Sequence, residues 1–252
     1  MSAKLVSVAP QTHSMRRRFS PWGLLVVASL MALIAGATVL VAWWLDSSRT
    51  ATVTYAVPGK LLGIELRVQS GNVTIVGGSH SGVSVSRSDH SVYGHGPREQ
   101  RRVRLGNLRL VSSCPELVFG SCASNFRIEV PDNVSISVQA EHGTVRLEGY
   151  QGSANITTIA GSISAEGYCG LVLGATSASG NISVGTSCSP ERLALFSDSG
   201  SVDVTVPAGH YRIHANSQSG SSHVIGLIND AGAPWDIEAV SNSGKVTVAA
   251  GT

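Results

Sequence analysis

The chain has 252 residues, of which 28 are Gly and only 4 are Phe, and charged side chains make up 13% of it. This composition is typical of short strands joined by tight turns rather than of a helical enzyme. The net charge of +2 conceals a gradient: residues 1–45 carry four basic and no acidic side chains, whereas residues 141–252 carry four basic and nine acidic ones. The acidic C-terminal part argues against nucleic acid as a partner.

Residues 22–45 form a run of 24 residues without one ionisable side chain. Such a run is long enough to cross a hydrocarbon core of about 30 Å as a helix. Three arginines at 16–18 precede it directly, so the positive-inside rule predicts a cytoplasmic tail of residues 1–21 and export of everything that follows the helix. We therefore expect a single-pass protein of the cell membrane with an extracytoplasmic C-terminal domain.

A cleaved signal peptide is the competing interpretation of the same segment. Its apolar region would be residues 24–34, followed by the small residues Ala35, Gly36 and Ala37 as a cleavage site. Cleavage there would leave a new N-terminus that begins with an apolar stretch containing two tryptophans. We favour the uncleaved anchor for that reason.

The last 110 residues repeat one pattern six times. In each copy apolar residues occupy the positions seven and five before a glycine and four after it, and in every copy but that of Gly220 also two after it. A polar residue stands three after each glycine. This period of 2 predicts two short strands with one buried face, joined at a corner where glycine supplies conformational freedom. The anchoring glycines are Gly143, Gly161, Gly180, Gly200, Gly220 and Gly244.

A unit of about 20 residues cannot bury its own apolar face, so the copies are expected to stack. The predicted fold is all-β, a β-solenoid-like stack of two-strand repeats preceded by one transmembrane α-helix. A linker is expected at residues 46–52 and a first, separated repeat at 53–76, around Gly71. The period breaks in an insertion at 77–127, and the β-solenoid repeats run from 128 to 252.

Three short sequences lead into alternating strands: Val57-Pro58-Gly59, Val130-Pro131-Asp132-Asn133 and Val206-Pro207-Ala208-Gly209. This cadence, over roughly residues 53–250, resembles the bacterial putative-adhesin family, a domain of unknown function built from β-strand repeats and often tethered by one N-terminal transmembrane helix. We expect a non-enzymatic role in binding, adhesion or structural and sensory support at the bacterial cell surface. The resemblance supplies no catalytic, metal or cofactor residues to carry over, and we expect none.

The alternative function is an exported hydrolase of envelope polysaccharide on a β-helix scaffold, which would need converging carboxylates. Ser183, Asp203 and His223 share one outward column and suggest a triad, but polar residues fill an exposed column by default. His210 and His214 stand about 13 Å apart on an extended strand, too far to share a zinc ion. His90 and His95 lie in a loop that contains glycine, where solvated histidines are the rule.

A cluster of arginines lies within the insertion, at Arg98, Arg101, Arg102, Arg104 and Arg109. Arginine suits bidentate contact with phosphate or carboxylate, so an anionic cell-envelope polymer or another envelope protein is a candidate partner. The other interpretation is an edge strand whose basic solvent face blocks aggregation. The sequence supports both equally, and it does not indicate an oligomeric state.

The repeat register pairs the cysteines. Cys169 and Cys188 each lie eight residues after an anchoring glycine, and equivalent positions on adjacent strands are about 4.8 Å apart, within reach of a disulfide. We therefore predict the disulfides Cys169–Cys188 and, within the insertion, Cys114–Cys122. Four free thiols are the alternative if the cell lacks an oxidative folding system.

Overall fold

A computed structural model describes residues 21–46, 48–78, 81–92, 96–115 and 121–251. The chain forms two compact units, one of residues 1–46 and one of residues 47–252. In the first unit, α1 (Pro21–Asp46) is a single apolar helix. Its segment Leu25–Trp44 has a mean hydropathy of 2.5, so by length and composition it can cross a membrane or serve as a signal sequence.

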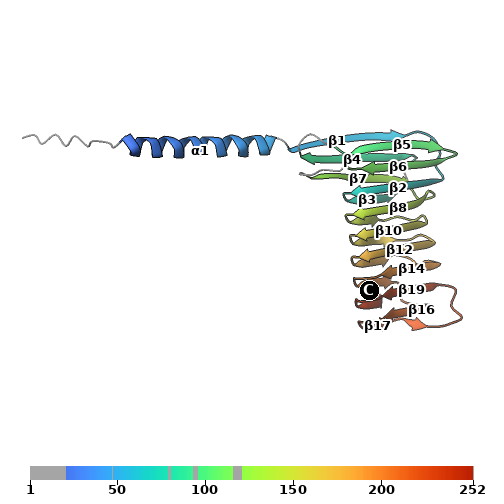
Figure 1. Ribbon diagram of the computed structural model, residues 1–252. Helices are drawn as coiled ribbons and strands as arrows, with labels where there is room; N and C mark the ends of the chain where they lie inside the picture. The colour runs from blue at the N-terminus through green and yellow to red at the C-terminus, as the bar shows by residue number, and fades with distance from the viewer. Residues whose placement is uncertain (1–20, 47, 79–80, 93–95, 116–120, 252) are drawn as a thin grey trace, which may run out of the picture. The chain divides into compact units, whose positions relative to one another are not determined.

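The second unit consists of two ten-stranded sheets that lie face to face and enclose the apolar core (Figure 1). Most neighbouring strands are parallel, as a stack of repeats requires. The strands are β1 (Ser48–Val57), β2 (Gly63–Ser70), β3 (Val73–Gly78), β4 (Val83–Val92), β5 (Arg98–Arg104), β6 (Asn107–Ser113), β7 (Cys122–Pro131), β8 (Ser135–His142), β9 (Val145–Glu148), β10 (Ala154–Ala160), β11 (Ile163–Tyr168), β12 (Val172–Ser179), β13 (Ile182–Thr186), β14 (Arg192–Ser197), β15 (Val202–Val206), β16 (His210–Ser217), β17 (Ser222–Ile225), β18 (Ile228–Asn229), β19 (Asp236–Ser241) and β20 (Val246–Ala250).

Each predicted copy forms one rung, with its first strand in one sheet and its second strand in the other. The predicted columns pair directly across rungs: Ile163 lies opposite Val145 and Ile182, and Leu173 lies opposite Ala154 and Leu193. These side chains are at most 4% exposed. The predicted fold class is therefore confirmed, because the period of 2 places one apolar face of each strand in the core.

The rungs do not stack in sequence order. The last copy, β19 and β20, lies between the fourth copy, β14 and β15, and the fifth copy, β16 and β17 (Figure 1). The fifth copy therefore forms the distal rung of the stack, with the two-residue strand β18 beyond it in one sheet. Val224 on β17 is 43% exposed there, whereas its counterpart Val204 is 1% exposed.

Close approach at the corners explains why the anchoring position is glycine. A Cβ atom at Gly161 would lie 1.9 Å from the carbonyl oxygen of Gly143, and one at Gly180 would lie 2.2 Å from that of Gly161. No side chain fits in that space. Three residues before five of the six corners, a hydroxyl donates a hydrogen bond to a glycine carbonyl, as Ser177 does to Gly161 and Ser197 to Gly180. At the Gly143 corner this position is Ala140.

The N-terminal end of the stack is built mainly from the expected insertion. Strands β6 and β7 form a further rung beyond β2 and β3, and β4 and β5 then add antiparallel to the two sheets. Residues 48–52, expected in a linker, belong instead to β1, which pairs with β4 along its whole length. The alternation of Thr and aliphatic residues after Arg49 supports a strand, and β4 supplies its backbone partners.

Candidate functional site

The arginine cluster lies on a hairpin at one edge of a sheet. Among the described strands β5 is an edge strand, and it pairs with β6 alone, through a turn at Leu105 and Gly106, both with positive φ. Alternation along β5 divides the arginines between two faces. Arg98, Arg102 and Arg104 lie on the outer face, whereas Arg101 lies on the inner face, with its guanidinium carbon 4.5 Å from the ring centroid of Tyr55.

Two arginines face each other across the hairpin. Arg102 and Arg109 are direct cross-strand partners on the outer face, an arrangement that costs stability because like charges are adjacent. Together with Gln100 and Val111 they line a hollow of about 250 Å³. Arg109 also forms an ion pair with Glu65, at a distance of 3.7 Å between Nε and Oε2, which solvent partly screens.

Unpaired positive charge is concentrated on β5. Arg67, Arg87, Arg127, Arg192 and Arg212 each form an ion pair with a carboxylate within 4 Å. Within the described part of the chain, Arg98, Arg102 and Arg104 form none. The outer face of this hairpin therefore carries a cluster of arginines without a carboxylate partner, whereas most other arginines of the described stack are paired.

A buried polar cluster holds the inner face of β5 against the opposite sheet. The guanidinium of Arg87 on β4 pairs with Glu99 on β5 and with Asp89, the latter at 2.7 Å. Tyr55 on β1 donates a 2.6 Å hydrogen bond to Glu99, and burial, followed by this bond to Glu99, raises the pKa of the Tyr55 phenol.

The cluster continues toward β6 and β7. Ser124 donates to Asp89 at 2.8 Å, and Ser112 donates to Ser124 at 2.9 Å. Sequence reasoning missed this cluster, although the signal existed: Arg87 and Asp89 continue the inward-facing column that begins with Val83 and Val85 on β4. Because each buried charge has a partner, the cluster fixes the position of β5 without exposing its carboxylates.

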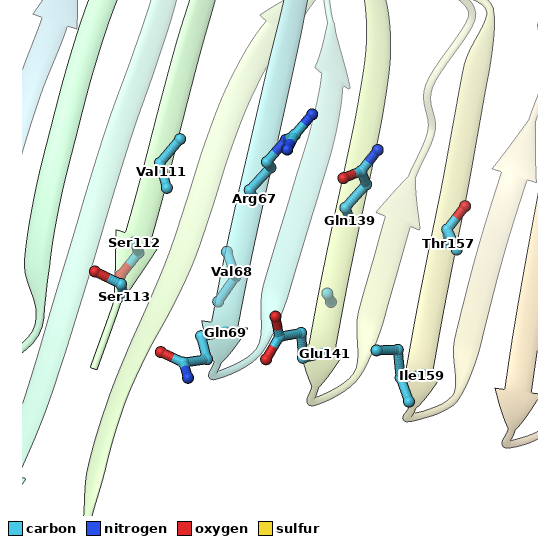
Figure 2. A pocket seen from close by; sticks show the side chains of 11 residues that line it. Arg67, Val68, Gln69, Val111, Ser112, Ser113, Gln139, Glu141, Thr157 and Ile159 are labelled. Carbon is cyan, nitrogen blue, oxygen red and sulfur yellow. The ribbon is translucent and has the colours of Figure 1, made fainter. Parts of the chain in front are cut away.

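A shallow groove of about 500 Å³ crosses the outer face next to the hairpin. Figure 2 shows its two rows of side chains on β6, β2, β8 and β10. One row holds Arg67, Gln139 and Thr157, which are cross-strand neighbours, and the other ends at Ile159. Val111 lines both this groove and the arginine hollow, and it lies opposite Arg67 on one side and Gln100 on the other, so the two lie side by side.

The triad hypothesis fails on geometry. Ser183 lies opposite Asp203, but Asp203 then lies opposite Thr247, and His223 follows beyond Thr247. His223 is therefore two strands away from Asp203, about 10 Å. The inserted last rung separates the two residues, which the sequence spacing had placed on neighbouring rungs.

The histidines occupy separate surroundings. His210 lies 3.6 Å from Asp230, and His214 lies opposite Glu238 on β19. His90 is on β4, not in a loop, while His95 is outside the described residues. Among the residues that the structure describes, no group of three His, Cys, Asp or Glu side chains is placed to hold a metal ion.

The structure contains both predicted disulfides. Cys169 and Cys188 are joined across consecutive rungs with Cα atoms 5.1 Å apart, and Cys114 and Cys122 are joined between β6 and β7 with Cα atoms 5.8 Å apart. The first disulfide links two consecutive repeats. The second links the two strands of the rung that carries the arginine hairpin.

The chain is similar to solved structures of bacterial proteins at low sequence identity. A putative cell adhesion protein from Clostridium sporogenes is 12% identical and superimposes with a TM-score of 0.51, over 81% of this chain and 100% of that one. A putative adhesin from Bacteroides fragilis is 13% identical, with a TM-score of 0.46 over 80% of this chain and 97% of that one. No curated protein matches the chain.

The C. sporogenes protein supports the fold alone, because its sequence identity is low. The family model described as Toastrack DUF4097 matches residues 42–249, which include the end of α1 and nearly all of the stack. The resemblance found in the sequence cadence is thereby confirmed, and the chain belongs to the Toastrack DUF4097 family.

Proposed function

We propose that this chain is a single-pass protein of the cell membrane whose exported β-repeat domain has a non-enzymatic binding or adhesion role. The observation that carries the proposal is the combination of an apolar helix with a stack that begins at Ser48, directly after it in sequence. The basic residues at 16–18 favour a cytoplasmic N-terminus. The similar structure from C. sporogenes, described as a putative cell adhesion protein, supports a surface role.

Most residues of the repeat pattern already have a structural role, and this favours a binding function over catalysis. The apolar columns fill the core, the glycines make the corners, and the buried hydroxyls pair with glycine carbonyls. The remaining concentrated chemistry of the stack is the positive hairpin and the adjoining open groove. A flat, open surface of this kind is suited to holding an extended partner rather than enclosing a reacting bond.

Protease protection tests the topology. The full chain, tagged at both ends, is expressed in cells that are converted to spheroplasts and treated with protease. We expect loss of the C-terminal tag and protection of an N-terminal fragment that contains residues 1–21 and the helix, with both tags degraded after lysis. A mature protein that begins near Thr38, or a C-terminal tag that is protected in intact spheroplasts, would refute the anchor.

Incubation with purified cell-wall polysaccharide separates binding from hydrolysis. We expect retention of the protein on the insoluble polymer without release of reducing sugar. Release of sugar that depends on one of the described carboxylates would favour the hydrolase instead.

A further inference from the structure

The hollow beside Arg102 and the groove beside Arg67 form one surface across five neighbouring strands, β5, β6, β2, β8 and β10. Four strand spacings of about 4.8 Å make it about 19 Å long. We propose that this surface binds an anionic polysaccharide. The guanidinium groups of Arg102 and Arg109 take one carboxylate, sulfate or phosphate group of the polymer, and the groove takes the neighbouring sugar units.

Charge complementarity assigns the oxyanion to the hairpin. Arg102 and Arg109 lie opposite each other, and the repulsion between their charges costs stability. An oxyanion bound between them would offset that repulsion and accept hydrogen bonds from several of their N–H groups. The amide of Gln100 lines the same hollow and adds a neutral donor. Glu99, which would oppose an anion, points to the inner face and is occupied by Arg87 and Tyr55. Glu65 lies on the outer face, where it pairs with Arg109 at 3.7 Å and with Arg67 at 2.8 Å.

The chemistry of the groove assigns the rest of the ligand to carbohydrate. Its floor and rim offer amides and hydroxyls, from Gln69, Gln139, Ser113 and Thr157, and one carboxylate, Glu141 (Figure 2). The amides and hydroxyls both donate to and accept from sugar hydroxyls, and the carboxylate accepts from them. The described lining contains no aromatic ring on which a nucleobase would stack.

The buried cluster gives the site a rigid base. Glu99 lies in β5 between Arg98 and Gln100. Because Glu99 is bonded to Arg87 and Tyr55, it holds in place the strand that presents Arg102. The edge position leaves the outer face open to an extended polymer. A preorganised arginine pair loses less side-chain entropy on binding than a flexible one.

This inference rests on the exported location proposed above, but it is tested on purified protein and can fail independently of the topology. The full chain is held in phosphatidylcholine nanodiscs and titrated with labelled polygalacturonate, with dextran sulfate and with uncharged dextran. The site variant is Arg102→Gln with Arg109→Gln. The matched control is Arg192→Gln with Arg212→Gln, which removes two charges from the same sheet at its distal end.

We expect both anionic polymers to bind and uncharged dextran to fail. The site variant should bind roughly tenfold more weakly for each guanidinium group removed, with a shallower dependence on salt. The matched control should bind like the original protein. Unchanged melting temperatures would show that the variants remain folded.

A second pair of variants tests the groove. Gln139→Ala with Thr157→Ala should weaken polygalacturonate binding without changing its salt dependence, because uncharged groups release no counterions. Thr176→Ala with Asn216→Ala, in the same row farther along the sheet, should have no effect. This comparison distinguishes a bound polymer from an anion held by the arginines alone.

Several outcomes would overturn the proposal. They are an equal loss of binding in both arginine variants, equal binding of uncharged dextran, no binding of either anionic polymer, or a groove variant that binds normally. Nanodisc-held protein is also mixed with vesicles with and without phosphatidylglycerol. Capture by the anionic vesicles through Arg102 and Arg109, at an affinity matching the polymers, would assign the surface to lipid instead.

Discussion

Ser241 donates a 2.7 Å hydrogen bond to the carbonyl oxygen of Gly200, a residue 41 positions earlier in the chain. Ser217, from the copy between them in sequence, donates instead to the carbonyl oxygen of Gly244. Each serine therefore donates to a glycine of the rung next to it in space. The rung of Ser241 stacks on that of Gly200, and the rung of Ser217 stacks on that of Gly244. The hydrogen bonds record the spatial order of the last three rungs, in which the C-terminal copy is inserted before the fifth.

Engineered disulfides should report this order. Thr247 lies directly opposite both Asp203 and His223, so Asp203→Cys with Thr247→Cys should cross-link readily at a spacing of about 4.8 Å. Asp203→Cys with His223→Cys should not, because about 10 Å separates them. Peptide mapping under non-reducing conditions gives the result, and the reverse pattern would mean that the copies stack in chain order.

Alanine at a corner glycine should destabilise the stack. In Gly161→Ala the new Cβ would meet the backbone of Gly143 at 1.9 Å, so we expect a loss of at least about 1–3 kcal/mol in the free energy of unfolding. Gly82→Ala is the matched control, since a Cβ there meets nothing within 4 Å. Denaturant unfolding followed by circular dichroism measures both, and equal stabilities would contradict the corner packing.

Removing the disulfide between rungs should cost more than removing the one in the N-terminal cap of the stack, the rung of β6 and β7. Cys169 and Cys188 close a loop of 19 residues, whereas Cys114 and Cys122 are 8 apart. Replacing the first pair by alanine should lower the free energy of unfolding by about 3 kcal/mol, and replacing the second pair by less. Urea unfolding of the two double variants makes the comparison. A larger loss from the cap pair would show that local packing outweighs loop closure.

Stability should fall at alkaline pH. Burial raises the pKa of Tyr150, with a smaller contribution from neighbouring Tyr168 and Asp132, and burial also raises the pKa of Tyr168. A raised pKa in the folded state means that the folded protein holds protons that the unfolded chain releases. The contribution is therefore complete below about pH 10 and is lost as the pH rises above it.

Phenolate absorbance and unfolding measured from neutral pH to above pH 10 check this expectation. The buried tyrosines should ionise only together with unfolding, and Tyr150→Phe should make the free energy of unfolding less dependent on pH. Reversible ionisation of Tyr150 and Tyr168 near pH 10 in the folded protein would be the contrary result.

Much of the stack follows directly from the sequence. The apolar columns, the glycine corners and the pairing of Cys169 with Cys188 could be predicted because parallel stacking places the same repeat position on adjacent rungs. The helix could be predicted because an uncharged run of 24 residues has few other solutions.

The site was predictable only in outline. The arginines were recognised as a cluster, but the division into an outer face and the single inward Arg101 depends on the register of β5 against β6. The buried partners Arg87, Asp89 and Tyr55 come from two strands of the opposite sheet. Long-range antiparallel pairing of this kind leaves no repeat in the sequence.

Rung order was decided by the tertiary structure alone. All six copies present nearly the same apolar stripe, so the local pattern does not say which copy covers which. One signal was present: Ser222 replaces the Val or Ile that the other copies carry in a buried column, and it is exposed in β17. A copy with a polar residue there is best placed at the end of the stack, because an end rung has one side in water and loses little by being polar.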